Sequence, residues 1–187
     1  MTILSDKDIK SYIQQKRITI EPFLEENIGP SSVDLRLDNK FLIFKHSDIT
    51  HVDPRNVKRE ELMSEVLKDG NNPFIIHPGE FILSNTIESV TLPADIVGRL
   101  DGRSSWGRLG IIVHSTAGNV HPGFSGQLTL EIANISKLPV CLYPGSKICQ
   151  IAFQLLSSPA EKPYNVRKES KYVNQQGPGA SKIDQEN

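Results

Sequence analysis

The chain has 187 residues, a formal charge of −1 and two cysteines. This length favours one domain over residues 1–187, able to bury a core without metal or disulfide support. The balance of 21 basic and 22 acidic residues excludes a broad basic surface, so we expect no nucleic-acid partner. No apolar run could span a bilayer and the N-terminus has no signal-peptide pattern, so we expect a cytoplasmic protein without a membrane partner.

The first predicted element is a short N-terminal helix. Ser5 is placed as its N-cap, and Asp8 completes an aspartate version of the capping box. Leu4 and Ile9 are spaced to pack against each other across the helix start.

Strands are predicted next along the chain. Residues 18–20 alternate β-branched side chains, and residues 32–37 alternate apolar with charged ones, as in a strand with one buried face. Residues 41–44 predict a more buried strand. The mixed charge of residues 57–68 favours a short exposed helix.

A Pro-Gly pair recurs in the second half of the chain. Proline fixes the second position of a type II turn and glycine accepts the positive φ of the third. The pairs lie at 78–79, 122–123 and 144–145, and strand-like runs follow at 81–83, 127–132 and 148–153. Many short strands separated by turns predict a mainly β fold, a barrel or a jelly roll.

Residues 157–187 differ from the rest in composition. They are rich in Pro, Lys, Asn, Gln, Gly and Ser, which is typical of a flexible C-terminal tail. The tail also holds Tyr164, Lys171 and Gln175, whose side chains could close over an anionic ligand. Composition alone favours a frayed terminus over such a lid.

The cysteines and histidines do not follow a zinc pattern. Cys141 and Cys149 lie in apolar strand-like runs and are too far apart for a tight metal-binding pair, so we expect two buried free thiols. The His-x-Glu and Cys-x-x-Cys motifs of zinc deaminases are absent, and we predict no zinc.

Residues 102–108 combine two glycines, two serines and two arginines. Glycine lets a ligand approach the backbone closely, and serine hydroxyls and arginine forks donate to phosphate oxygens. The Gly-Lys-Ser/Thr ending of a Walker loop is missing. A phosphate-binding loop and an ordinary polar turn both fit this segment.

Residues 127–133 carry a carboxylate within an apolar strand pattern. Leu130 shares one face with its apolar neighbours, and Thr129 and Glu131 share the other. Glu131 is therefore either part of a solvated strand face or a general base held in a pocket.

Taken together, these motifs resemble the dCTP deaminase family of the dUTPase-like superfamily. The matching segments keep a consistent order over nearly the whole chain: 32–37, 102–105, 108–110, 116–118, 122–126, 130–131, 144–145, 171–172 and 174–177. The resemblance implies a homotrimer of dUTPase-like distorted β-barrels, with active sites between subunits. It also implies dCTP as substrate, with Mg²⁺ on the triphosphate oxygens and no metal held by the protein itself.

The resemblance also implies roles for individual residues. Glu131 would be the general base that takes a proton from the water attacking C4 of cytosine. Ser104 and Arg108 would come from the neighbouring subunit to position the substrate, and residues 157–187 would become a lid over the nucleotide. The other implied substrate contacts are Arg103, Ser105, Trp106, Gly107, Ala117, His121, Thr129, Leu130, Gln150, Tyr164, Lys171 and Gln175.

One position departs from the family pattern. The family usually has Ile-Asp-Pro-Gly where this chain has Val-His-Pro-Gly at 120–123. In dUTPases the equivalent aspartate orients the water, and in bifunctional members it is thought to serve pyrophosphate release. Gly118 and Gln150 resemble bifunctional members, whereas Asn119 and the long tail resemble monofunctional ones.

The missing aspartate favours the monofunctional interpretation over the bifunctional one. We predict a monofunctional enzyme that converts dCTP to dUTP and ammonia, supplying dUTP for dUMP and dTTP synthesis, with dTTP as a candidate inhibitor. The alternatives are a bifunctional enzyme that releases dUMP and pyrophosphate, a plain dUTPase, and a non-catalytic nucleotide-binding relative.

Overall fold

The computed structural model describes residues 2–45, 50–69, 71–114 and 116–186. Within these ranges, twelve strands pair antiparallel in three sheets. The six-stranded sheet has the order β4 (Met63–Leu67), β3 (Lys40–Phe44), β6 (Phe81–Thr91), β10 (Ser125–Asn134) and β8 (Ile111–Ile112), with β1 (Thr19–Glu21) also paired to β6.

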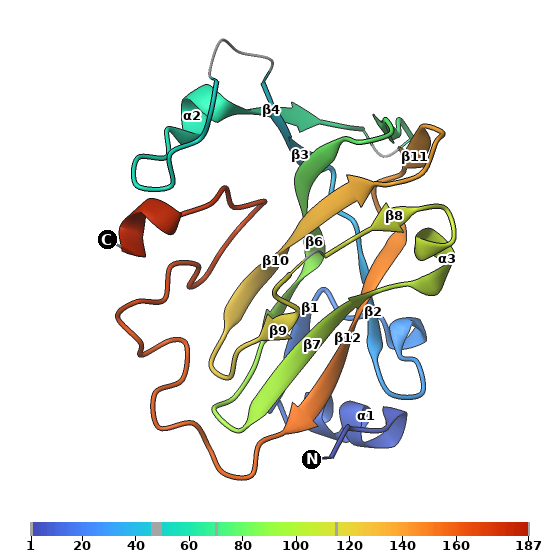
Figure 1. Ribbon diagram of the computed structural model, residues 1–187. Helices are drawn as coiled ribbons and strands as arrows, with labels where there is room; N and C mark the ends of the chain where they lie inside the picture. The colour runs from blue at the N-terminus through green and yellow to red at the C-terminus, as the bar shows by residue number, and fades with distance from the viewer. Residues whose placement is uncertain (1, 46–49, 70, 115, 187) are drawn as a thin grey trace.

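The four-stranded sheet packs against this one (Figure 1). Its order is β2 (Val33–Arg36), β12 (Lys147–Leu155), β7 (Ile96–Gly102) and β9 (Asn119–Val120), and β5 (Phe74–Ile76) pairs with β11 (Val140–Leu142) separately. The helices are short: α1 (Asp6–Gln14), η1 (Glu25–Asn27), α2 (Arg59–Leu62), α3 (Ser104–Gly107) and η2 (Ile183–Glu186). None of the helices in the described ranges combines the length and apolar character needed to cross a membrane.

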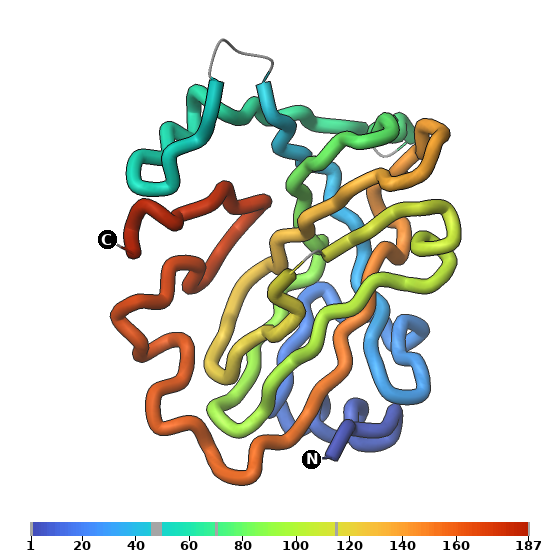
Figure 2. The backbone as a smooth tube through the Cα atoms, viewed as in Figure 1, coloured from blue at the N-terminus to red at the C-terminus, as the bar shows by residue number. Residues whose placement is uncertain are grey.

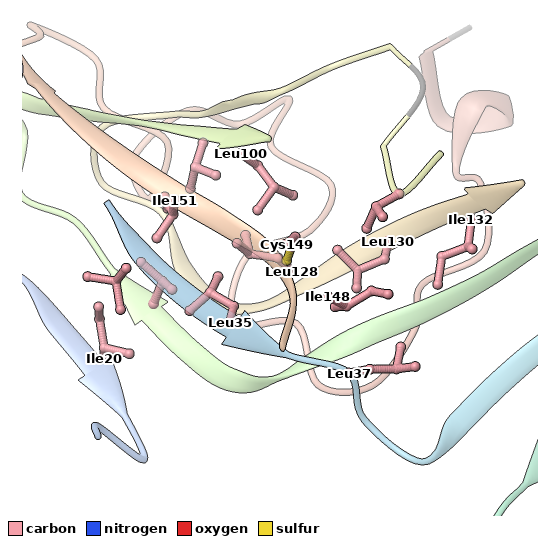
Figure 3. Packing of buried hydrophobic residues seen from close by; sticks show 14 of the residues in the cluster. Ile20, Leu35, Leu37, Leu100, Leu128, Leu130, Ile132, Ile148, Cys149 and Ile151 are labelled. Atoms are coloured by element: carbon pink, nitrogen blue, oxygen red, sulfur yellow. The ribbon is translucent and has the colours of Figure 1, made fainter. Parts of the chain in front are cut away.

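The core lies between the two larger sheets and forms one cluster. Alternation along β10 buries every second side chain, and the matching positions of β12 and β2 are buried too. Figure 3 shows part of this packing through Ile20, Leu35, Leu37, Leu100, Leu128, Leu130, Ile132, Ile148, Cys149 and Ile151. The mainly β fold is confirmed, although the described strands pack as sheets and do not close into one continuous barrel.

Local signals in the sequence account for the start of α1. Ser5 accepts a hydrogen bond from the backbone N–H of Asp8 at 3.3 Å, and its hydroxyl donates to the Asp8 carboxylate at 2.9 Å. Leu4 and Ile9 are both buried beside it. The predicted N-cap is confirmed, and both residues of the predicted hydrophobic contact lie in the core cluster.

The three Pro-Gly pairs form the expected turns. Gly79, Gly123 and Gly145 have φ values of 81°, 80° and 84°, which suit the third position of a type II turn. The strands β6, β10 and β12 follow them, as predicted.

Three expectations about local structure need correction. Within residues 57–68 only Arg59–Leu62 is helical, because Met63–Leu67 pairs with β3 as an edge strand. In β3, Phe41 is buried but Phe44 is 49% exposed, so this strand is buried only in part. Cys149 is buried, but Cys141 is exposed, because alternation along the short strand β11 turns Leu142 inward instead.

The tail, residues 157–186, runs along the side of β10 and ends beside α2 (Figure 2). The backbone N–H of Asn174 donates to the Ser125 carbonyl at 2.9 Å, and that of Gln127 donates to the Gln175 carbonyl at 2.9 Å. This contact depends on Gly126, which has a φ of 139° and whose added Cβ would lie 2.7 Å from the Gln175 nitrogen. The tail is therefore docked on the sheet.

Candidate functional site

A cavity of about 750 Å³ lies against the face of β10 that points away from the core. Gln127, Thr129 and Glu131 line it from β10, because their apolar neighbours occupy the core side of the strand. The tail and the chain around α2 complete the walls. The volume suits a small-molecule ligand.

Glu131 lies in the middle of β10, opposite Leu83 of β6 in the strand register. Its half-buried side chain shares the cavity wall with Phe81 and Leu83. A carboxylate held by a paired strand beside apolar side chains can accept a proton from a bound water. Leu130, by contrast, is fully buried on the opposite face, so its side chain cannot contact a ligand in this cavity.

The tail covers Thr129. The side-chain amide of Gln175 donates a hydrogen bond to the Thr129 hydroxyl oxygen, and the backbone N–H of Gly179 donates to the same oxygen at 3.0 Å. The predicted contacts Thr129 and Gln175 thus meet each other across the cavity wall.

His121 and Tyr164 form an aromatic wall of the cavity. Their rings stack with centroids 5.9 Å apart and planes inclined by 6°. The backbone N–H of Tyr164 donates to the Pro122 carbonyl at 2.7 Å, and the Tyr164 hydroxyl accepts from the Tyr172 N–H at 3.1 Å. Two segments distant in sequence are therefore joined at the ligand-facing side of the turn before β10.

A second cavity of about 420 Å³ adjoins the first. Arg99 and Asp101 of β7 border it, and the predicted contacts Ala117 and His121 line both cavities. His114 also lines both cavities. Both of its ring nitrogens are buried and have no hydrogen-bond partner among the described residues.

The cationic groups of the first cavity come from two places. Lys171, a predicted contact, pairs with Glu186, and Arg59 pairs with Asp184. Arg59 was not expected from the sequence, because its segment carries no motif and has the pattern of an exposed helix.

The other predicted residues form a separate group around α3, away from the tail in Figure 1. Ser104, Ser105, Gly107 and Arg108 are exposed, and none of them lines the first cavity. One chain therefore does not bring this loop together with Glu131.

The base of the α3 loop is held by the four-stranded sheet. Arg103 pairs with Asp34 at 3.1 Å, and the Trp106 indole N–H donates to the Lys147 carbonyl at 2.9 Å. Gln150 lies on β12, where its side-chain oxygen accepts from the Ser32 hydroxyl at 2.9 Å. Arg103, Trp106 and Gln150 are thus half-buried by contacts within the chain.

No group of three or more His, Cys, Asp or Glu side chains suited to a metal ion occurs in the part of the chain that the structure describes. Burial raises the pKa of the Cys149 thiol far above its ordinary value, with smaller contributions from Glu88 and Asp34. Cys149 is therefore a protonated core residue rather than a ligand or nucleophile.

The fold and the cavity define a class of antiparallel β protein with a ligand-sized cavity beside a strand carboxylate. Residues 3–156 match the model of the dCTP deaminase-like family. The chain belongs to this family. The match ends just after β12, so the tail lies beyond it.

Similar proteins carry specific names. A protein from Dictyoglomus turgidum named "dCTP deaminase, dUMP-forming" is 55% identical over 183 residues, covering 97% of this chain and 94% of its own. One of the same name from Methanosphaera stadtmanae is 54% identical over 186 residues, covering 98% and 94%.

Among solved structures, the 2'-deoxycytidine 5'-triphosphate deaminase from Agrobacterium tumefaciens has a TM-score of 0.65 and 26% identity. The similarity covers 82% of this chain and 48% of that one, so this chain corresponds to about half of the solved chain.

Proposed function

We propose that the protein removes the amino group of dCTP and then releases pyrophosphate, leaving dUMP. The position of Glu131 in a ligand-sized cavity carries the deaminase half of this proposal. The names of the relatives at 55% and 54% identity support the whole reaction. These names conflict with the dUTP product that is predicted from His121. The bifunctional reaction therefore replaces the predicted monofunctional one.

In the deamination step, Glu131 takes a proton from a water molecule, and the oxygen attacks C4 of the cytosine ring. The same carboxyl then passes protons to N3 and to the exocyclic nitrogen. The C4–N bond breaks, ammonia leaves and a uracil ring remains. The backbone near Ala117 is assigned to the base, where its groups distinguish cytosine from uracil.

In the second step, water attacks the α-phosphorus, the bond to the bridging oxygen breaks, and pyrophosphate leaves. We assign His121 to this water, since it lines both cavities and occupies the position where the family usually has aspartate. A neutral imidazole can accept a hydrogen bond through one ring nitrogen. Summed over both steps, dCTP and two waters give dUMP, ammonia and pyrophosphate.

The triphosphate is proposed to arrive with Mg²⁺ on its oxygens, so the ion is part of the substrate. The exposed α3 loop, with Ser104 and Arg108, is proposed to reach the cavity of a neighbouring subunit in a homotrimer. Arginine forks and serine hydroxyls suit phosphate oxygens. This arrangement agrees with the separation of the two residue groups within one chain.

The direct test follows ammonia and pyrophosphate together after dCTP and Mg²⁺ are added. Equal amounts of both, with dUMP as the nucleotide product, are expected. Ammonia alone, with dUTP accumulating, would overturn the second step. Pyrophosphate alone would make the protein a nucleotide pyrophosphatase without deaminase activity, and neither product would leave a binding protein.

A further inference from the structure

Two basic side chains from distant segments converge on one acidic turn. Arg59 of α2 donates to the Asp184 carboxylate, and Lys171 of the tail donates to the Glu186 carboxylate. Asp184 and Glu186 are two residues apart within η2. Both basic side chains line the cavity and are held close together by this turn.

These ion pairs are partly shielded from water. Arg59 and Asp184 are 31% and 23% exposed, and Lys171 is 18% exposed, whereas its partner Glu186 is 59% exposed. Partial burial weakens the screening that makes surface ion pairs ineffective. The carboxylates thus neutralise two cations that line the ligand-sized cavity.

Neighbouring hydrogen bonds hold η2 in this position. Arg59 also donates from Nε to the Ser181 carbonyl at 2.6 Å, and the Lys182 ammonium donates to the Lys171 carbonyl at 2.7 Å. The Lys182 N–H donates to the Tyr172 hydroxyl at 3.0 Å. These hydrogen bonds, and not its charges alone, hold η2 in place.

We propose that Arg59 is a second cation beside Lys171, itself an implied substrate contact, in an anion subsite for the polyphosphate of the nucleotide, and that the carboxylates of Asp184 and Glu186 compete with the polyphosphate for these two cations. The proposal rests on the proposed function for the identity of the nucleotide. Guanidinium and ammonium groups bind carboxylate and phosphate oxygens alike. Arg59 would thus be a binding residue supplied by α2, outside the motifs that mark the family in this sequence.

Competition from the carboxylates of η2 should lower the apparent affinity for polyphosphate. A polyphosphate that enters the subsite must displace η2, because like charges at contact distance repel. The apparent affinity is then reduced by the fraction of chains in which η2 occupies the subsite. Weakening η2 should therefore tighten polyphosphate binding.

The first experiment measures the binding of inorganic tripolyphosphate to the full chain by titration calorimetry. Glu186→Gln and Asp184→Asn should each lower its Kd by about threefold, as expected for partly exposed ion pairs. Glu169→Gln is the matched control, because it removes the same charge from an exposed tail position that lies outside the cavity. Unchanged or weaker binding in the first two variants would overturn the proposal.

The second experiment tests whether Arg59 binds phosphate or only holds η2 in place. In the Asp184→Asn/Glu186→Gln background, Arg59→Ala should raise the Kd for tripolyphosphate by about tenfold, and Arg59→Lys should recover part of the loss. If Arg59 only anchored η2, Arg59→Ala would have no effect in that background, and the subsite would be refuted. Neither readout requires turnover, so the subsite is tested even if dCTP is not the substrate.

Discussion

Alternation along β10 sets the chemistry of the cavity at the scale of single residues. Every second side chain is buried in the core, which leaves Thr129 and Glu131 on the cavity face. A shift of one residue would bury the carboxylate and expose Leu130. The strong apolar pattern of this strand therefore also fixes the position of Glu131, the proposed general base.

Replacing Glu131 by Gln keeps the size of the side chain but removes its ability to take a proton. We expect ammonia release from dCTP to fall by at least about a hundredfold, with nucleotide binding largely retained. Ammonia release and calorimetric binding of dCTP are the two measurements. Glu21→Gln, at an exposed end of β1, is the control. A Glu131→Gln variant with most of its activity would contradict the mechanism.

His121 is expected to affect the two steps differently. His121→Ala should lower pyrophosphate release by about tenfold or more, with a smaller effect on ammonia release, so that dUTP accumulates. His77→Ala is a matched control, because His77 is exposed, precedes an equivalent Pro-Gly turn and lies outside the cavity. Equal losses in both products would show that His121 supports binding in general and not the second step.

At the scale of elements, the docking of the tail is a property of β10 as much as of the tail. The backbone of Gln175 approaches the strand closely only because position 126 has no Cβ. Thr129 and Gln127 then accept hydrogen bonds from the N–H groups of Gly179 and Gly177. Docking is thus encoded at positions about fifty residues before the tail segment that docks.

Gly126→Ala should release the tail from β10. An added Cβ would lie 2.7 Å from the Gln175 nitrogen and 2.8 Å from its oxygen, so the tail must move. We expect faster cleavage of residues 157–186 in limited proteolysis. Gly145→Ala is the control, since it also has a positive φ but has open space around it. Equal cleavage of both variants would mean that general destabilisation, and not the lost contact, exposes the tail.

The sequence predicted those elements whose causes are local. The cap at Ser5, the Pro-Gly turns and the alternation in β10 were predicted because each needs only neighbouring residues. The edge strand Met63–Leu67 was missed because it is stabilised by pairing with β3 and not by its own pattern. The outward face of Cys141 depends in the same way on its partner strand.

The site was predictable to the same extent. Glu131 and Thr129 stand out by their place in an apolar strand, and the tail residues by the resemblance to a family. Arg59 could not be found, because its role depends on a contact with Asp184 across more than a hundred positions. Composition favoured a frayed tail for the same reason, since the groups that dock it lie elsewhere in the chain.

At the scale of the whole molecule, the predicted site residues fall into two separated groups. The cavity group includes Glu131, and the exposed α3 group includes Ser104 and Arg108. In the proposed homotrimer, a site shared between subunits would use both groups, although one chain leaves them apart.

This arrangement predicts complementation between inactive variants. Glu131→Gln and Arg108→Ala should each be inactive alone but regain activity when co-expressed. A site is complete when its carboxylate comes from one variant and its arginine from the other, so about a quarter of the sites should work in random trimers. Ammonia release by the purified mixture measures this fraction. No recovery in proven mixed oligomers would show that both groups act within one subunit.

The docked tail follows the family-matched residues in the chain, and this order has a consequence for truncated products. Residues 3–156 hold the family-defining part of the fold, and the cavity-lining residues Tyr164, Lys171 and Gln175 follow them in the chain. A chain that stopped before residue 157 would contain every strand of both large sheets but would lack the cavity wall that the tail forms. Products of premature termination are therefore expected to keep the strands of the fold and to lose the tail side of the cavity.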